Sequence, residues 1–440
     1  MSTPSIAVFD IGKTNKKLYV FDLEGNKLYE EYTSFEEIKD EDGFPTEDLN
    51  ALCEWMKKSF DDLLDDIRFD VQKLNFATYG ASFVHLDKDG QFIESFYNYL
   101  KYLPEDFNKQ FEADHGDKNT VVIDTYSPWL GLLNSGMQLR WLKEYQSEKY
   151  NRIHTSLHLP QYLSYLFTGK LFTDPTSLGC HTALWDFKKK TYHRWVKEDG
   201  IDSKFPELVQ GDHSVKTTIK GKEIEVGVGI HDSSSALVPY LKKSKEPFIL
   251  ISTGTWSICL NSFSDDVLTE DQLAKDCLCF LNPYTVPVKA SRLFLGNEYE
   301  VQTNKLAKHF DVPVDTHKTV KPNNDLLDKL IAGKLKNNFY PESINNPLLL
   351  KKYIKNFYDL NKYKTYDEAY HHMMWGLTLL QLDSLDLVLE KEKIKTIFID
   401  GGFIHNTIFV SILEKMLPEI KIVPSEMPSG TALGAAMVIA

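Results

Sequence analysis

Small polar residues follow the first apolar run of the chain, in the segment Asp10-Ile11-Gly12-Lys13-Thr14-Asn15. A carboxylate at the end of a buried strand can hold Mg²⁺ through water, so Asp10 is a candidate metal ligand. A glycine turn brings backbone N–H groups close to an anion, and Lys13, Thr14 and Asn15 add charge, hydroxyl and amide donors. The segment predicts a phosphate-binding turn at Gly12, although an ordinary hairpin turn has the same composition.

A second segment repeats this layout about 240 residues later. Phe248–Ser252 is an apolar strand, Thr253-Gly254-Thr255 is a tight turn, and Trp256–Asn261 is a second strand. Two such turns on either side of a cleft can grip one polyphosphate from both sides. The repeat also indicates that the chain has a duplicated architecture.

Asp232 is the third chemical feature, because it ends an apolar, glycine-containing segment and precedes Ser233-Ser234-Ser235-Ala236. One interpretation is that Asp232 caps a helix that begins in this run of small residues. The other is that it acts as a general base, since phosphoryl transfer to an alcohol needs a carboxylate that accepts the hydroxyl proton. We favour the base, because the carboxylate lies just before the expected domain boundary.

The elements that must position these residues alternate between strands and helices, which predicts an α/β fold. The first 33 residues read as a three-stranded meander, so the first phosphate turn joins two strands and does not open a helix. Helices are expected over Glu47–Phe69, Asp367–Glu390 and Thr407–Met416, and a strand over Leu74–Tyr79. A polar stretch near residues 241–246 predicts an N-terminal domain over 1–243 and a C-terminal domain over 244–440.

Composition excludes several classes of protein. The 440 residues carry a net charge of −13, which argues against nucleic acid as the main partner. The five cysteines form no C-x-x-C pair, as is typical of free thiols in a reducing compartment. Without a basic, apolar leader or a stretch of about 18 apolar residues, the protein is expected to be cytoplasmic and not bound to a membrane.

Four segments carry a resemblance to a known family. Thr78–Asp87 is similar to T-W-G-x-D-F-x-L-L-D, Gly229–Ala236 to G-x-H-D-T-x-S-A, and Ile251–Ser257 to S-S-G-T-W-S; Ile399–Asn406, with Gly430–Ala436, resembles an adenosine-binding part. On these motifs the chain resembles the FGGY family of carbohydrate kinases from about Ile6 to Ala440. It looks closest to the rhamnulokinases and L-fuculokinases, and Trp256, after the second turn, is the most subfamily-specific residue.

The resemblance implies two ribonuclease H-like (actin-like ATPase) domains around a central cleft, with ATP and Mg²⁺ as cofactors. It implies that Asp232 is the catalytic base and that Asp10 helps to position the metal. The other implied contacts are with the sugar (Gly80, Ala81, Ser82, His231 and Asp232), with the phosphates (Gly12, Lys13, Thr14, Asn15, Thr253, Gly254 and Thr255) and with adenosine (Gly401, Gly402 and Asn406).

The implied reaction transfers phosphate from ATP to a ketose, and O1 of a 6-deoxy-ketohexose such as L-rhamnulose or L-fuculose is the preferred acceptor. Ala81-Ser82 stands where rhamnulokinases carry x-Asp, and Lys13 stands where many relatives have Thr or Ser. A pentulose, another ketose or a polyol therefore stays an alternative acceptor. An actin-like ATPase switch without a sugar substrate is the alternative of a different class. The expected partners are a small sugar and ATP, and homodimer formation is kept open.

Overall fold

The chain folds into two compact α/β units. A computed structural model describes residues 2–265, 268–336, 338–353, 359–425, 427 and 429–440. One unit comprises Met1–Lys243, Cys279–Pro287 and Pro428–Ala440, and the other comprises Ser244–Leu278 and Val288–Met427. The first unit therefore contains the whole N-terminal half of the chain together with two short later segments, one of which is the C-terminus.

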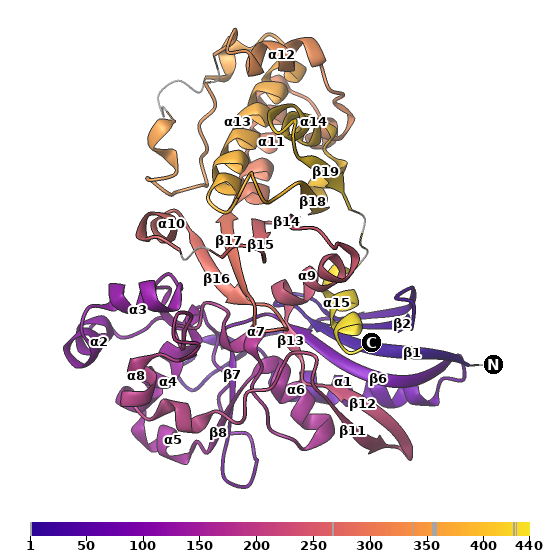
Figure 1. The fold of residues 1–440 in the computed structure, drawn as a ribbon, viewed down its shortest axis with the longest axis vertical. Coiled ribbons are helices and arrows are strands. Elements are labelled where there is room, and N and C mark those ends of the chain that lie inside the picture. The colour runs from indigo at the N-terminus through magenta and orange to yellow at the C-terminus, as the bar shows by residue number, and fades with distance from the viewer. Residues whose placement is uncertain (1, 266–267, 337, 354–358, 426, 428) are drawn as a thin grey trace. The chain divides into compact units, whose positions relative to one another are not determined.

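The first unit is built on a mixed sheet (Figure 1). Its strands are β1 (Thr3–Ile11), β2 (Lys16–Asp22), β3 (Lys27–Thr33), β6 (Phe69–Thr78), β11 (Ser214–Ile219), β12 (Lys222–Gly227) and β13 (Ile230–His231). The order is β11-β12-β6-β1-β2-β3, and β13 also pairs with β6. The first three strands form the expected antiparallel meander, whereas β1, β6 and β13 run parallel to one another.

Helix α1 (Leu49–Asp65) covers this sheet with one apolar face. Asp48 caps it by accepting a hydrogen bond from the backbone N–H of Ala51, and Leu52, Met56 and Phe60 are buried in the core with Phe9 and Phe76. The helix is shorter than the expected Glu47–Phe69, because Phe69 and Val71 already alternate into the core as the start of β6. The expected strand at Leu74–Tyr79 accordingly begins at Phe69.

The second unit repeats the arrangement of the first. Its strands are β14 (Phe248–Thr253), β15 (Ser257–Asn261), β16 (Cys277–Leu281), β17 (Pro287–Leu293), β18 (Thr396–Gly401) and β19 (Lys421–Pro424), in the order β16-β17-β15-β14-β18-β19. The neighbours β17, β15 and β14 are antiparallel, and β14, β18 and β19 are parallel. The series β17-β15-β14-β18-β19 matches β3-β2-β1-β6-β12, which confirms the predicted duplication.

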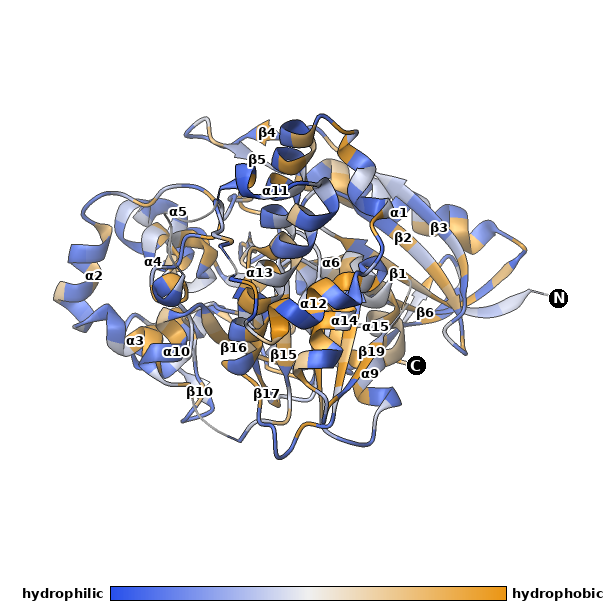
Figure 2. Cartoon of the chain, turned by 90° about the horizontal axis from the view of Figure 1, so that it is seen from above, coloured by the Kyte–Doolittle hydropathy of each residue, from blue (hydrophilic) through white to orange (hydrophobic). Residues whose placement is uncertain are grey.

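The longer helices of the second unit pack on its sheet and on one another. They are α11 (Leu295–Phe310), α12 (Asn324–Ile331), α13 (Tyr366–Asp386) and α14 (Thr407–Met416). Figure 2 shows hydrophobic residues gathered on strands and on the helix faces beside them, as expected for α/β layers. Helix α14 has the predicted bounds, and α13 ends four residues before the expected Glu390.

The C-terminal helix α15 (Gly430–Val438) belongs to the first unit. It packs on α9 (Asp232–Lys243), and Gly434 lies so close to Ser235 that a Cβ would come within 1.8 Å of the Ser235 carbonyl oxygen (Figure 1). The small residues of α15 therefore allow two helices to approach closely. No helix in the described part of the chain combines the length and the apolar character that crossing a bilayer requires.

The remaining helices and short strands lie outside the two main sheets. They are β4 (Ile38–Lys39), β5 (Pro45–Thr46), β7 (Phe83–Leu86), α2 (Phe107–His115), α3 (Lys118–Thr125), α4 (Ser135–Tyr145), α5 (Ser147–Arg152), β8 (Thr155–His158), α6 (Leu159–Thr168), α7 (Pro175–Leu178), β9 (Trp185–Asp186), β10 (Thr191–Tyr192), α8 (Arg194–Glu198) and α10 (Glu270–Ala274).

Candidate active site

The parallel strands of the first unit bring the predicted base and metal ligand to one edge of the sheet. In the register of β1 and β6, Asp10 pairs with Ala77 and Ile11 with Thr78; in the register of β6 and β13, Thr78 pairs with His231. The carboxyl ends of β1, β6 and β13 therefore coincide. Polar side chains at such ends gather into one site, as in other open α/β sheets.

The Gly12 turn closes on itself at this edge. The backbone N–H of Gly12 donates to the carbonyl of Asn15 at 2.9 Å, and Thr14 and Asn15 are exposed. A Cβ on Gly12 would lie 3.1 Å from that carbonyl oxygen, so the tight turn favours glycine. The exposed hydroxyl and amide of Thr14 and Asn15 are accessible to a phosphate.

Lys13 is held by carboxylates. Its Nζ lies 3.0 Å from Glu47 Oε1 and 3.5 Å from Glu37 Oε1, and 5.9 Å from the ring centroids of Tyr79 and Tyr99. The side chain is 27% exposed. Glu47 is shared with Lys16, whose Nζ lies 2.9 Å from Glu47 Oε2, so Glu37 and Glu47 together offset the charges of Lys13 and Lys16. Nothing in the local motif indicated these ion pairs.

Asp232 begins helix α9 immediately after His231. Its Oδ1 accepts a hydrogen bond from the Ser233 backbone N–H at 2.6 Å and lies 3.2 Å from His231 Nε2. The Asp232 side chain is 35% exposed, whereas the His231 side chain is only 7% exposed. The carboxylate therefore supports the first turn of the helix and still has surface available to a ligand.

The acidic groups of this site hold their protons unusually well. Burial, followed by the neighbouring Asp232 carboxylate, raises the pKa of Asp10 to about 6. Burial also raises the pKa of Asp232 to about 6, against the opposing effect of the Ser233 hydrogen bonds. Burial lowers the pKa of His231 to about 4, so this imidazole is neutral at pH 7. Two carboxylates near their pKa beside a neutral histidine are suited to proton transfer close to neutrality.

The His231 ring is packed by residues from two other segments. A Cβ on Gly80 would lie 3.1 Å from ring atoms Cδ2 and Nε2, and Cys180 Sγ lies 3.2 Å from Nε2. The His231 backbone N–H donates to the hydroxyl of Thr176, which in turn donates to Asp174. The loop around Asp174 and Thr176 thus positions the histidine, and Cys180 is a neighbour that the sequence motifs did not indicate.

Ala81 and Ser82, two of the predicted sugar contacts, are each only 2% exposed. Ala81 has a φ of +64°, and the carbonyl of Ser82 accepts from the Leu159 backbone N–H. Gly80 is half-buried. The structure therefore brings Gly80, His231 and Asp232 together, while Ala81 and Ser82 are buried in the turn that follows Gly80.

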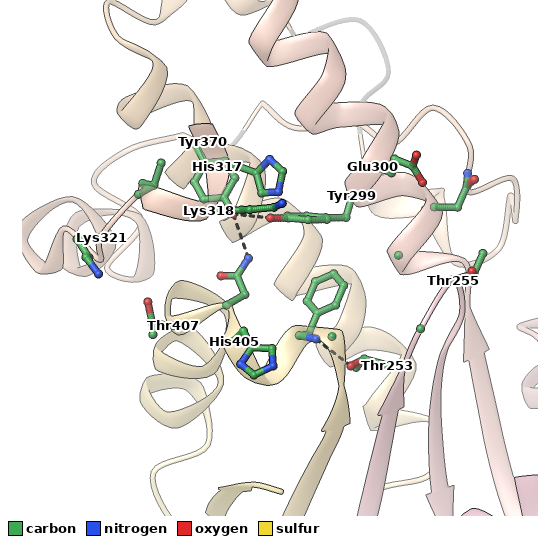
Figure 3. Close-up of a pocket in the computed structure, with 17 residues that line it drawn as sticks. Thr253, Thr255, Tyr299, Glu300, His317, Lys318, Lys321, Tyr370, His405 and Thr407 are labelled. Carbon is green, nitrogen blue, oxygen red and sulfur yellow. Dashed lines mark hydrogen bonds between the residues drawn. The ribbon is translucent and has the colours of Figure 1, made fainter. Parts of the chain in front are cut away.

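The predicted nucleotide residues meet at the ends of β14 and β18 in the second unit. The Thr253 hydroxyl donates to the Asp400 carbonyl at 2.5 Å. It also accepts from the Phe403 backbone N–H at 3.1 Å (Figure 3). Gly401 has a φ of +84°, and a Cβ there would lie 1.8 Å from the Thr253 carbonyl oxygen. The buried Thr253 side chain therefore ties the two loops together, while Gly254 and Thr255 are exposed.

A cavity of about 700 Å³ opens beside this junction (Figure 3). Its lining includes Thr253, Gly254, Thr255, Gly402 and Asn406, so five predicted nucleotide contacts share one pocket. Gly401 supports the pocket wall through its contact with Thr253. The residues that complete the lining are Gly296, Asn297, Tyr299, Glu300, His317, Lys318, Val320, Lys321, Tyr370, Phe403, His405 and Thr407. The volume is within the usual range for a small-molecule site.

Two helices begin at this cavity. Gly296 and Asn297 lie in the first turn of α11, and Thr407 is the first residue of α14. The Asn297 backbone N–H donates to the Thr255 carbonyl at 3.2 Å, which holds α11 against the hairpin turn. Helix N-termini attract anions, and Lys318 and Lys321 add positive charge. None of the sequence motifs covers α11, and none indicated Tyr299, Lys318 or Tyr370.

Within the described residues, no group of three or more His, Cys, Asp or Glu side chains could hold a metal ion. The chemistry of Asp10 nevertheless fits Mg²⁺, because its carboxylate offers oxygen and the negative charge of the nearby Asp232 adds to the burial that raises its pKa. Magnesium is commonly bound by one or two carboxylates together with substrate phosphates and water.

Comparison with known proteins extends these observations. A 263-residue segment is 23% identical to a rhamnulokinase of Oceanobacillus iheyensis and covers 57% of this chain and 54% of that protein. A 137-residue segment is 28% identical to an L-fuculokinase of Escherichia coli K12 and covers 29% of this chain and 28% of that protein. The chain thus spans about half the length of the first of these relatives and less of the second.

A crystal structure of a carbohydrate kinase from Novosphingobium aromaticivorans has the same fold, with a TM-score of 0.84, 22% sequence identity, and coverage of 100% of this chain and 92% of the other. The predicted two-domain α/β class is confirmed. The model of the N-terminal domain of the FGGY family of carbohydrate kinases matches residues 5–238, and the model of the FGGY C-terminal domain matches residues 245–440. The chain belongs to the FGGY family of carbohydrate kinases.

Proposed function

We propose that this protein transfers the γ-phosphoryl group of ATP to O1 of a 6-deoxy-ketohexose such as L-rhamnulose or L-fuculose. Membership of a family of phosphotransferases with alcohol acceptors supports the reaction class. The similarity to a rhamnulokinase and to an L-fuculokinase supports the acceptor. The observation that carries the proposal is the Asp10–Asp232 pair, with its raised pKa values, at the carboxyl edge of the first sheet.

Asp232 is the proposed base. As the acceptor O1–H approaches the γ-phosphorus, its proton passes to the Asp232 carboxylate, the O1–P bond forms, and the bond between phosphorus and the bridging oxygen of ADP breaks. His231, neutral at pH 7, can accept or donate one hydrogen bond to the sugar without competing for the proton. Gly80 leaves room for this ring, and the Thr176 hydroxyl holds its backbone in place.

The second-unit cavity is the proposed nucleotide site. Aromatic side chains can stack on a base, and the helix N-termini with Lys318 and Lys321 favour polyphosphate. Gly254 and Gly402 are exposed and lack side chains, so phosphate oxygens can approach their backbone. In the first unit, the Gly12 turn supplies Thr14 and Asn15 as further polar contacts.

Asp10 is the residue that would hold Mg²⁺. When bound, the ion would neutralise charge on the transferring phosphate. Asp10 would contribute its carboxylate oxygens to the metal, which leaves the Asp232 carboxylate free to accept the proton. A pentulose or polyol stays an alternative acceptor because the Ala81-Ser82 turn is buried and carries no carboxylate.

The test is ADP release from the wild-type protein with ATP, Mg²⁺ and a panel of ketoses and polyols, followed by ³¹P–¹H NMR of the product. We expect L-rhamnulose or L-fuculose to give the largest rate and phosphate to appear on C1. Faster turnover with a pentulose or polyol would contradict the proposed acceptor. If no sugar raises ADP release above the basal rate, the ATPase-switch alternative replaces the kinase.

A further inference from the structure

Three polar side chains from three helices form a hydrogen-bonded chain in the wall of the cavity. Asn406 Nδ2 lies 3.0 Å from the Tyr370 hydroxyl, and the Tyr370 and Tyr299 hydroxyls are 2.8 Å apart (Figure 3). Tyr299 comes from α11, Tyr370 from α13, and Asn406 caps α14. The family motif points only to Asn406, and the two tyrosines lie outside every motif of the sequence.

The cap fixes the orientation of the Asn406 amide. Its Oδ1 accepts from the Phe409 backbone N–H at 3.1 Å, so the end that faces Tyr370 is the NH₂ group, a donor. The same Nδ2 also donates to Met374 Sδ at 3.6 Å. The Asn406 side chain is therefore committed to protein partners and has little capacity left for a ligand.

The donor count then sets the direction of the chain. Tyr370 accepts from Asn406, and one phenolic proton is used between the two tyrosines, so one phenolic proton is left over. Both tyrosines line the cavity, but Tyr370 is only 2% exposed, whereas Tyr299 is half-buried. An unused donor on the buried Tyr370 would cost more than one on Tyr299. The favoured order is Asn406 to Tyr370 to Tyr299, with the free O–H at the cavity.

We infer that the Tyr299 hydroxyl donates a hydrogen bond to a ring nitrogen of the nucleotide's purine base, and that Tyr370 and Asn406 are positioning residues that orient this hydroxyl. The inference rests on the proposed binding of ATP in this cavity. Purine rings offer unprotonated nitrogens as acceptors. The ring centroids of Phe403 and His317 lie 5.1 and 5.6 Å from that of Tyr299. These rings offer aromatic surface on which a base can stack.

Both phenols keep their protons at neutral pH. Burial raises the pKa of Tyr370 well above its ordinary value and raises the pKa of Tyr299 as well. Hydrogen bonds in such a chain polarise one another, so the terminal O–H of Tyr299 is a better donor than an isolated phenol. The chain thus links base recognition to the packing of α11, α13 and α14.

The experiment measures ADP affinity by isothermal titration calorimetry at pH 7.5, which does not depend on turnover. We expect Tyr299→Phe and Tyr370→Phe each to weaken ADP binding about fivefold, the net value of one hydrogen bond. Because the two hydroxyls act in series, the double variant should lose about fivefold as well, and not about 25-fold. The matched control is Tyr366→Phe, one turn earlier on α13, whose ring stacks 6.0 Å from Tyr370 and whose buried hydroxyl has no hydrogen-bond partner among the described residues.

Asn406→Asp tests the direction of the chain while it keeps an oxygen for the Phe409 cap. The carboxylate accepts from Tyr370, Tyr370 then accepts from Tyr299, and the cavity loses its donor. Adenosine is the probe for this variant, because a neutral ligand is not repelled by the added charge. We expect adenosine to bind about fivefold more weakly at an unchanged melting temperature.

Deaza analogues of ADP identify the nitrogen in the wild-type protein, without any substitution. Among 1-, 3- and 7-deaza-ADP, one should lose about fivefold in affinity for the wild type and none for Tyr299→Phe. Equal ADP affinity of wild type and Tyr299→Phe, a 25-fold loss in the double variant, or undiminished binding of all three analogues would overturn the inference. Failure of the wild type to bind ADP at all would instead contradict the proposed function.

Discussion

Replacing Asp232 by Asn separates a base from a helix cap. The Ser233 backbone N–H donates to Asp232 Oδ1 at 2.6 Å, and an amide oxygen can accept that same bond. The start of α9 should therefore survive the substitution. Proton acceptance should not, because an amide has no basic lone pair in the required pKa range. Removal of a general base lowers kcat by roughly 10²–10⁴-fold, and we expect that loss for Asp232→Asn.

The same substitution should stabilise the fold above neutral pH. The pKa of Asp232 is about 6, against an unfolded value of 3.8, so the native state binds more protons between these values and loses stability as pH rises through them. A difference of about 2 units corresponds to about 3 kcal/mol. Since the side chain is 35% exposed, solvent screening reduces this to about 1 kcal/mol. For a unit of this size, that is a rise in Tm of about 2 °C at pH 8.

The assay pairs kcat from coupled ADP release with thermal melting at pH 8 and at pH 4. The wild type and Asp232→Asn should melt alike at pH 4, where both side chains are close to neutral, and differ at pH 8. Asp186→Asn is the control, because hydrogen bonds and Lys189 lower the pKa of Asp186 and its loss should destabilise the protein at pH 8. If Asp232→Asn melts lower at pH 8 and keeps near-normal kcat, Asp232 is a structural cap and the reasoning fails.

Three further predictions follow from the same contacts. In a pH–rate series from 4.5 to 8, kcat/KM for the sugar should fall at least tenfold per pH unit below about 6 as Asp232 and Asp10 protonate, and a flat profile down to pH 5 would contradict the assignment. Gly80→Ala places a methyl group 3.1 Å from the His231 ring and should raise the KM for the sugar about tenfold; an equal loss of ADP affinity by calorimetry would show a general disruption instead. Gly401 has a φ of +84°, and the Cβ of Gly401→Ala would lie 1.8 Å from the Thr253 carbonyl oxygen, so this variant should destabilise the second unit by about 3 kcal/mol in urea unfolding. The control Gly333→Ala has a φ of +67° but no atom within 4 Å of the added Cβ, and it should cost about 1 kcal/mol. Equal costs for the two variants would refute the clash at Gly401.

Local patterns predicted most of the framework. The two strand–turn–strand repeats could be predicted because apolar runs of strand length flank a glycine turn. The structure contains both of them, as the antiparallel pairs β1–β2 and β14–β15. Helix α14 was expected at about Thr407–Met416 and has these bounds, with Asn406 as its cap. The boundary between α1 and β6 was misplaced, since Phe69 fits a helical stripe as well as the alternation of a buried strand.

The contacts between segments that are distant in the chain could not be predicted from the sequence. Nothing near Lys13 in the chain indicates that Glu37 and Glu47 pair with it, and nothing near His231 points to Cys180. The order of strands in a sheet decides such contacts, and a single sequence carries no direct record of that order. Glycine turns that bind a ligand through the backbone can be recognised in the sequence. The side chains that contact such a turn can come from any part of the fold, so the sequence near the turn does not identify them.

The two hairpin turns share a backbone plan and differ in the use of their side chains. In both, the glycine N–H closes the turn, to Asn15 in the first unit and to Trp256 in the second. The first turn carries a lysine whose charge is already paired with Glu47, so its free groups are neutral donors. The second turn carries no charge, but the N-terminus of α11 adjoins it and the cavity beside it includes Lys318. The cavity also includes Lys321 and the acidic Glu300, so one carboxylate partly offsets its two lysines. The first unit contributes the acidic pair, in which Asp232 comes from α9 and not from the turn. Duplication of the strand–turn–strand segment therefore accounts for the two glycine turns, whereas the proposed base comes from an element outside that segment.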